Sequence, residues 1–355
     1  MANEDRNQKI VTLLKTLMST SDGLSLIRDT LRSGGISTLQ QVEAMTFPEV
    51  TDPVRLANAE EGVLMDTETT GVDTSKDKVI QLAMRKVKYD SQGILSVGEV
   101  FDRFRDPGMP IPAEVTRITR ITDEDVKGHT IDDGEVRAFL GSAKKVICHN
   151  AGFDRKMVER NFPDAGFDKI DFDCTFAQVD WLSRGCNGRS LEQIALQAGY
   201  VYGSHNALND INVMPYILNQ DHPELGTPWS ELHANSNASS ILLIAENSTF
   251  AVKDHLKENG YRWSPDGQDA AGYEKSWYKI LPDDPEVLAE EADFLREKIY
   301  QRDASLPAFR ISGMERYSAR RPVTKEVFRT AEVRTAIDVV AQKSVTQEPQ
   351  GAFGF

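Results

Sequence analysis

Residues 62–71 read Gly-Val-Leu-Met-Asp-Thr-Glu-Thr-Thr-Gly, an apolar run that leads directly into two carboxylates. The apolar part, residues 62–65, is typical of a buried strand. On an extended strand, residues two apart point to the same face, so Asp66 and Glu68 are expected to present their carboxylates together. Two like charges held side by side are costly unless a cation lies between them. A solvated strand end followed by a turn would have the same sequence, so this stretch alone leaves a metal site open.

The chain around this stretch alternates between strand and helix patterns. Strand character is found at residues 79–87, 97–104 and 145–148. Helical spacing of apolar residues follows at residues 155–161, 190–198 and 207–219. Adjacent strands followed by strand–helix alternation predict an α/β layer with a mixed sheet.

Two further motifs place acidic groups where a strand is expected to end and a helix to begin. Residues 149–154 read His-Asn-Ala-Gly-Phe-Asp, and Asp154 is expected in the first turn of a helix. The helix dipole favours an Asp at that place even without a function. Residues 205–210 read His-Asn-Ala-Leu-Asn-Asp, with His205 before a helix and Asp210 expected about a turn and a half inside it. Functional groups of α/β sheets collect where strands end and helices begin, which favours a shared site.

Taken together, these motifs have the order of a known family. The five reactive side chains follow one another as Asp66, Glu68, Asp154, His205 and Asp210. This arrangement resembles the DEDDh class of 3′-5′ exonucleases, which are similar to proofreading exonucleases, and the resemblance covers roughly residues 61–219. It implies a ribonuclease H-like fold, in which a mixed five-stranded sheet is flanked by helices.

Additional segments support the resemblance, and one position departs from it. Residues 111–114 and 118–124 are similar to the family's segment between the first and second motifs. Cys174-Thr175, together with residues 190–192, is similar to the run into the third motif. The family usually has glycine where this chain has Arg120. That position lies at a helix–loop junction, so the departure concerns local backbone geometry rather than chemistry.

The resemblance also implies a mechanism with two divalent cations around one phosphate. Asp66 would bridge both ions, Glu68 and Asp210 would complete the first site, and Asp154 would support the second. His205 would be the general base that accepts a proton from the attacking water. An oxygen-only ligand set suits Mg²⁺ or Mn²⁺. Thr67 and Thr69, with the backbone after the first carboxylate, would neighbour the terminal sugar.

Changes in composition and the positions of turn-forming residues divide the chain into five parts. We expect a helical N-terminal segment at residues 1–58, the exonuclease domain at 59–222, a linker at 223–240, a small α+β module at 241–300 and a polar, partly basic C-terminal tail at 301–355. The module would carry a short helix over residues 253–259, flanked by strands. The basic stretch 310–329 could be a positive surface or a solvated helix face.

The module interleaves aromatic and basic residues, which suits stacking on bases and contact with phosphates of single strands. The residues concerned are Arg262, Trp263, Trp277 and Lys279. The alternative is that the tryptophans form the core of a very small domain, which needs large apolar anchors. The last residues, 350–355, read Gln-Gly-Ala-Phe-Gly-Phe and are similar to peptides that dock on replication clamps.

The bulk properties agree with a cytoplasmic enzyme. The chain has 355 residues and a formal net charge of −14. This charge disfavours non-specific binding along nucleic-acid duplexes, but it does not disfavour binding of a strand end. Its three cysteines lack disulfide or metal spacing, and neither a signal peptide nor a membrane span is expected. We expect a 3′-5′ exonuclease acting on single-stranded DNA or DNA 3′ ends. An RNA-trimming enzyme, a non-catalytic nucleic-acid-binding protein and a homodimer remain open.

Overall fold

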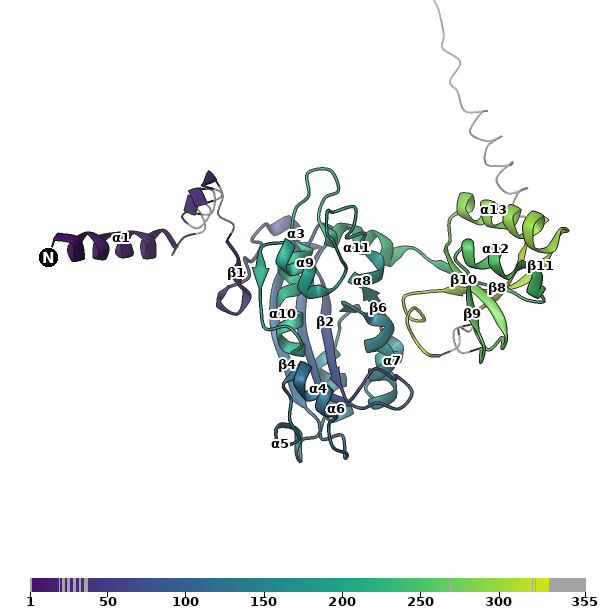
Figure 1. Ribbon diagram of the computed structural model, residues 1–355, viewed down its shortest axis with the longest axis horizontal. Coiled ribbons are helices and arrows are strands. Elements are labelled where there is room, and N and C mark those ends of the chain that lie inside the picture. The colour runs from purple at the N-terminus through teal and green to yellow at the C-terminus, as the bar shows by residue number, and fades with distance from the viewer. Residues whose placement is uncertain are drawn as a thin grey trace, which may run out of the picture.

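The computed structural model describes residues 2–331, except 19, 21, 22, 24, 25, 28, 29, 32, 35–37, 268, 269, 321 and 323. An N-terminal helix, a central α/β domain and a C-terminal module follow one another along the chain (Figure 1). The clamp-peptide prediction at residues 350–355 lies outside the described residues.

The central domain is built on a mixed five-stranded sheet with the order β4-β3-β2-β5-β6. Its strands are β2 Glu60–Thr69, β3 Val79–Tyr89, β4 Ile94–Phe104, β5 Lys145–Cys148 and β6 Asp171–Cys174. β2 pairs antiparallel with β3 and parallel with β5, which puts it at the centre of the sheet. The predicted mixed five-stranded sheet is therefore confirmed. Its fifth strand, β6, had not been located in the sequence.

Alternation along β2 divides the interior of the domain between the two faces of the sheet. Val63 and Met65 belong to a core with α6 Asp133–Leu140 and α7 Ala151–Asn161. Leu64 belongs to the opposite core, which contains residues of the helices α9 Leu191–Gln197, α10 Ala207–Leu218 and α11 Pro228–Asn237. Helices thus cover both faces of the sheet (Figure 1), as residues buried on two sides require.

The remaining elements belong to the central domain and to the segment before it. They are α1 Ala2–Met18, β1 Gln40–Gln41, η1 Val42–Ala44, α3 Pro53–Ala57, α4 Ala113–Thr119, α5 Asp123–Val126, η2 Phe167–Lys169, α8 Thr175–Gln178 and β7 Tyr200–Val201. The expected first helix is confirmed as α1. Beyond it, residues 40–41 pair with β7 instead of continuing a helical segment to residue 58.

The C-terminal module is a second five-stranded sheet with the order β12-β11-β8-β10-β9. Its elements are β8 Ser240–Ala245, η3 Phe250–Val252, α12 Lys253–Glu258, β9 Arg262–Ser264, β10 Ser276–Pro282, α13 Pro285–Phe294, η4 Leu295–Tyr300, β11 Ser305–Ile311 and β12 Lys325–Arg329. The predicted short helix is confirmed as α12, and Gly260 just after it has a φ of +82°. Such a conformation favours glycine and ends the helix.

Two predicted boundaries are wrong. Residues 223–240 are not a simple linker, because α11 buries Trp229 and Leu232 in the central domain. The Trp229 Nε1 also donates to the Asp90 backbone oxygen at 2.7 Å. The tail does not begin at residue 301 either, since β11 and β12 are strands of the module's sheet. The stretch 310–329 consists of these strands and the loop between them, not of a helix.

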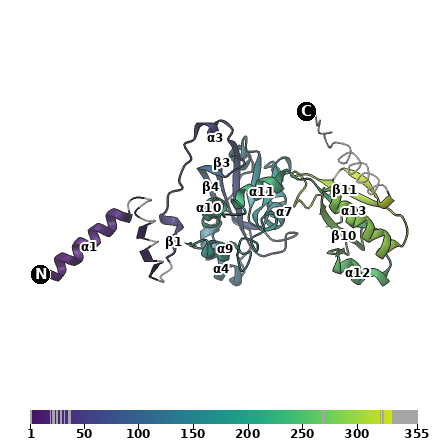
Figure 2. The same ribbon diagram turned by 90° about the horizontal axis from the view of Figure 1, so that it is seen from above.

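The module lies next to the edge of the central domain that carries β6 and α7, as both views show (Figures 1 and 2). Within the described part of the chain, no helix combines the length and the apolar character needed to span a bilayer.

Candidate active site

Three of the predicted carboxylates meet on one face of the sheet. Asp66 and Glu68 come from β2, on the same face as Leu64, and Asp210 comes from the first turn of α10, which covers that face. One carboxylate oxygen from each of the three lies within 4.8 Å of the others. Asn206 caps α10 by accepting a hydrogen bond from the Asn209 backbone nitrogen. Asp210 therefore lies less far inside its helix than predicted.

Asp154 reaches the same strand from the opposite face. It lies in the first turn of α7, as predicted, and is 2% exposed. Thr67 points away from Asp66 and Glu68, and its hydroxyl donates to Asp154 Oδ1 at 2.7 Å. The strand thus holds two carboxylates on one side directly and a third on the other side through a hydroxyl. This contact explains how Asp154 is oriented, and no sequence motif had indicated it.

The carboxylates raise one another's pKa values. Burial, followed by the charges of Asp154, Asp210 and Glu68, raises the pKa of Asp66. Burial and then Asp210 and Asp154 raise the pKa of Glu68 to about 8. Burial raises the pKa of Asp154 to about 7, although the Thr67 hydroxyl opposes this shift. An acidic cluster of this kind is poorly compensated by the protein alone, and oxygen ligands at this spacing fit a divalent cation. The residues present therefore fit the expected metal.

Two further groups adjoin Asp210. The Tyr202 hydroxyl, which is buried, donates to Asp210 Oδ1 at 2.8 Å. Burial raises the pKa of Asp210 to about 6, while the Tyr202 bond and the charge of His205 oppose this shift. His205 is exposed and has a φ of +61°, on the loop just before α10. Tyr202 was missed from the sequence because nothing marks a tyrosine in a loop as the partner of a carboxylate eight residues later.

His149 lies directly before Asn150, the N-cap residue of α7, and both of its ring nitrogens contact the protein. Its Nδ1 lies 2.7 Å from the Thr175 hydroxyl, and its Nε2 lies 2.8 Å from the Arg189 backbone oxygen. Burial lowers the pKa of His149 to about 4, so the ring is neutral at physiological pH. Since both ring nitrogens have partners, we interpret His149 as a structural link between the α7 loop and residues 175–189.

The residues predicted to contact nucleic acid are only partly available. The Thr67 and Thr69 hydroxyls are both buried, and the latter donates to the Gly71 oxygen at 2.6 Å, so only backbone groups of β2 remain for a terminal sugar. In the module, Trp277 is 8% exposed and belongs to the core.

Lys279 in turn forms an ion pair with Glu291. Of the four module residues, Arg262 and Trp263 are exposed, the latter by 48%. Trp277 is therefore a core residue of the module, as the alternative interpretation expected. The ring of Trp263 packs edge-on against the ring of Trp277, with 5.4 Å between the ring centroids.

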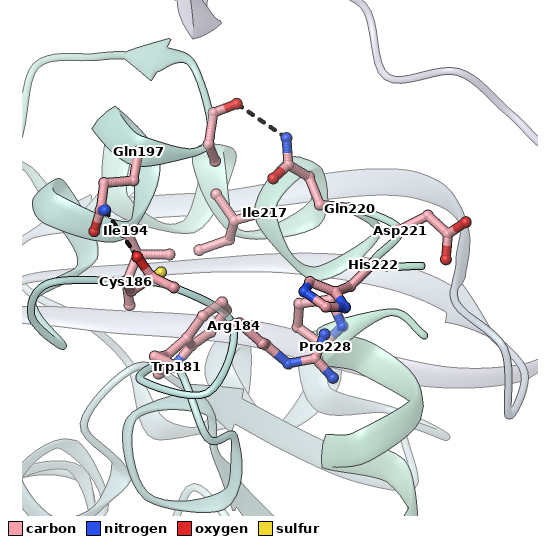
Figure 3. A pocket seen from close by; sticks show the side chains of 12 residues that line it. Trp181, Arg184, Cys186, Ile194, Gln197, Ile217, Gln220, Asp221, His222 and Pro228 are labelled. Atoms are coloured by element: carbon pink, nitrogen blue, oxygen red, sulfur yellow. Dashed lines mark hydrogen bonds between the residues drawn. The ribbon is translucent and has the colours of Figure 1, made fainter. Parts of the chain in front are cut away.

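The central domain also contains a cavity that the carboxylates of the candidate site do not line. Trp181, Arg184, Ile194, Ile217 and His222 are among the residues that line it (Figure 3). Arg184 is already paired with Glu231 at 2.9 Å and donates to backbone oxygens of the loop before α11. None of the five predicted catalytic residues lines this cavity.

The comparison with protein families agrees with this geometry. Residues 63–218 match the family RNase_T, described as exonuclease. This segment is therefore similar to RNase_T exonuclease domains. The match ends at Leu218, the last residue of α10, so the C-terminal module lies outside it.

Relatives of the exonuclease domain include segments of large polymerases. The chain is 36% identical over 112 residues to a DNA polymerase III PolC-type of Halalkalibacterium halodurans, covering 30% of this chain and 7% of that protein. It is 32% identical over 146 residues to a DNA polymerase III PolC-type of Streptococcus pyogenes, covering 39% of this chain and 10% of that protein. The chain thus spans a tenth or less of these relatives.

Among solved structures, Exonuclease X in complex with 5′ overhanging duplex DNA aligns with a TM-score of 0.34 and 21% identity, over 43% of this chain and 86% of that chain. Exonuclease I of E. coli in complex with a dA16 oligonucleotide aligns with a TM-score of 0.36 and 15% identity, over 53% of this chain and 48% of that one.

Arg120, the departure from the family pattern, ends α4 in the left-handed conformation with a φ of +63°. Its backbone nitrogen donates to the Thr116 oxygen, as a helix-ending residue does. Glycine adopts this conformation without a steric penalty, which accounts for the family's usual residue. The departure therefore concerns backbone geometry, as expected.

Proposed function

We propose that this protein removes nucleotides from the 3′ end of single-stranded DNA by hydrolysis, with two divalent cations, Mg²⁺ or Mn²⁺, in its exonuclease domain. The observation that carries the proposal is the meeting of Asp66, Glu68 and Asp210 within 4.8 Å. An uncompensated cluster of this density is unfavourable in the absence of a cation. The family match of residues 63–218 supports exonuclease chemistry.

Each site residue has a distinct part in the proposal. Asp66, Glu68 and Asp210 would hold the first cation, and Asp66 with Asp154 would hold the second. When bound, the cations supply an activated water and charge stabilisation at the scissile phosphate. Thr67 and Tyr202 keep the carboxylates Asp154 and Asp210 in place by hydrogen bonds from buried hydroxyls.

His205 is proposed as the general base. Its exposed position before α10 leaves the imidazole accessible to an incoming strand end. His205 lies five residues before Asp210, which is in the first turn of α10. His205→Ala should lower kcat by about 10²–10⁴-fold, the range of general base catalysis. The matched control is His129→Ala, because His129 is also exposed in the same domain. Wild-type turnover of the His205 variant at neutral pH would remove His205 from the mechanism.

Arg262 and Trp263 are proposed to contact the strand upstream of its end. An exposed tryptophan beside an arginine offers a stacking surface and a phosphate contact. Replacing Trp263 by alanine should raise the KM for long oligonucleotides and leave that for very short ones unchanged. Equal effects on both lengths would indicate a loss of folding in the module instead.

The function is tested by digestion of 5′-labelled and 3′-labelled oligonucleotides, with and without Mg²⁺ or Mn²⁺. Early release of labelled mononucleotide from the 3′-labelled strand, lost with EDTA and in Asp66→Ala, is the expected result. A ladder that shortens from the 5′ end would contradict the polarity. Matched RNA and double-stranded substrates identify the preferred nucleic acid, and digestion of RNA alone would replace DNA with RNA in the proposal.

A further inference from the structure

The loop between β11 and β12 of the C-terminal module is inserted against the exonuclease domain. The Phe172 backbone nitrogen of β6 donates to the Gly313 oxygen at 3.1 Å, so the loop continues the hydrogen bonding of that edge strand. Tyr317 packs against the core that contains α7, and its hydroxyl donates to Gln178 Oε1 at 3.0 Å. The loop is therefore bound by both backbone and side-chain contacts, although it lies about a hundred residues beyond the RNase_T match.

The centre of this contact is Arg155, the residue directly after Asp154. Its side chain has no exposed surface. One terminal nitrogen, Nη1, donates to the Gly313 and Arg316 oxygens at 2.9 and 2.7 Å. The other, Nη2, donates to the Met314 oxygen at 2.7 Å. A buried guanidinium needs partners for its donors, and here the loop supplies three of them.

The exonuclease domain provides the remaining contacts of Arg155. Its Nε donates to Glu159 Oε1 at 2.8 Å, one turn along α7. Its guanidinium carbon lies 4.4 Å from the centre of the Phe172 ring. Glu159 also accepts from Ser318 at 2.6 Å and from Arg320 at 3.2 Å, both in the loop. The loop thus contacts α7 at two positions, one residue and five residues after Asp154.

From these contacts we infer that the β11–β12 loop, residues 312–320, is a working part of the exonuclease site, because it holds the first turn of α7 through Arg155 and thereby positions Asp154. Thr67 fixes the Asp154 carboxylate on the side of the sheet, and the loop fixes the helix backbone on the other side. Arg155 and the loop are positioning elements that do not touch the substrate. The expected change in kcat rests on the proposed function, whereas the expected change in amide hydrogen exchange does not.

Gly313 offers a way to displace the loop from the module's side. A Cβ at this position would lie 2.6 Å from Asp171 Cγ and 2.9 Å from both Asp171 carboxylate oxygens. Gly313→Asp adds steric overlap and a second negative charge, so the loop has to move away from β6. Ala319→Asp is the matched control, because Ala319 is exposed in the same loop. Asp171→Ala combined with Gly313→Asp removes the overlap and the repulsion and should restore the contact.

Amide hydrogen exchange of the metal-free, full-length protein tests the coupling without substrate. In Gly313→Asp, exchange should rise in residues 313–318 and also in residues 151–155, while Ala319→Asp remains like the wild type. In assays with Mn²⁺ on an oligonucleotide, kcat should fall by about tenfold to a hundredfold, the effect of a catalytic group displaced by about 1 Å. The KM for DNA should stay within about twofold, and the added Asp171→Ala should recover most of both effects.

Two results would overturn the inference. The first is faster exchange in the loop with unchanged exchange in residues 151–155 and unchanged kcat. The second is unchanged exchange in the loop both in Gly313→Asp and in Arg155→Met, which removes the guanidinium from the other side of the contact. If the wild type itself released no nucleotides, the proposed function would fail, whereas the exchange data would still decide whether the loop holds α7.

Discussion

The metal-free carboxylate cluster should make the exonuclease domain less stable as the pH rises, and Glu68→Gln should relieve this effect. The pKa of Glu68 is raised from 4.5 to about 8, chiefly by burial and then by Asp210 and Asp154. A carboxyl with a raised folded-state pKa keeps its proton more tightly when folded. Its stabilising contribution is therefore present below about pH 4.5 and is lost as the pH rises to about 8.

The magnitude follows from the shift. Each pKa unit corresponds to about 1.4 kcal/mol, which gives an upper bound of about 5 kcal/mol for Glu68. The carboxyl is partly exposed, and relaxation and solvent screening reduce the expected effect to roughly 2 kcal/mol. Gln cannot ionise, so the metal-free Glu68→Gln protein should exceed the wild type by that amount at pH 8.5 and by almost nothing at pH 5. For a domain of this size, roughly 2 kcal/mol is about 4–8 °C in Tm.

Thermal unfolding in EDTA at pH 5 and pH 8.5, followed by circular dichroism, measures the difference. Glu224→Gln is the matched control, since Glu224 is exposed. Saturating Mn²⁺ should reverse the order at pH 8.5, because the bound cation stabilises the wild-type cluster more than the variant. A Glu68→Gln protein that is less stable than the wild type at pH 8.5 without metal, or a gain of equal size at both pH values, would refute the electrostatic reasoning.

Three other substitutions test single contacts. Thr67→Val removes the hydrogen bond from the Thr67 hydroxyl to Asp154, which opposes the rise in the pKa of that carboxyl. The pH of half-maximal kcat/KM should therefore move upward. Urea unfolding should show a loss of stability of about 1–3 kcal/mol. Tyr202→Phe removes the corresponding bond to Asp210 and should raise the Mn²⁺ concentration for half-maximal activity; an unchanged metal titration would contradict this role. Arg120→Gly should stabilise the protein by about 1 kcal/mol without changing kcat, because it relieves the left-handed conformation, and a lower Tm would count against that explanation.

The central sheet and the reactive residues could be predicted from the sequence, because the patterns that indicate them lie within short stretches of the chain. The apolar run at residues 62–65 predicted a buried strand, and the two-residue repeat of a strand then placed Asp66 and Glu68 on one face. The apolar run before residue 149 placed Asp154 at a helix start. Hydrophobic patterning and short motifs of this kind depend on neighbours along the chain, and the family resemblance then assembled them into one site.

The boundaries of the C-terminal part could not be obtained in this way. Residues 223–240 are polar enough to suggest a linker, yet α11 packs on the central domain through buried apolar side chains, among them Trp229 and Leu232. The strands after residue 301 are short and carry several charges. β11 pairs with β8 and β12 pairs with β11, and these backbone hydrogen bonds between strands leave no mark in local composition.

The partners of the catalytic carboxylates belong to the same category. Thr67 was expected near a sugar and Tyr202 was not noticed, whereas both hydroxyls bind carboxylates that are 87 and 8 residues away in the chain. Arg155 was only the first residue of a predicted helix, and its partners at residues 313, 314 and 316 are backbone oxygens, which are present in every residue type. Residue identity and spacing therefore specified which groups carry the chemistry. The groups that hold them in place emerged from folding alone, because a backbone oxygen or a buried hydroxyl acquires its partner only when distant segments pack together.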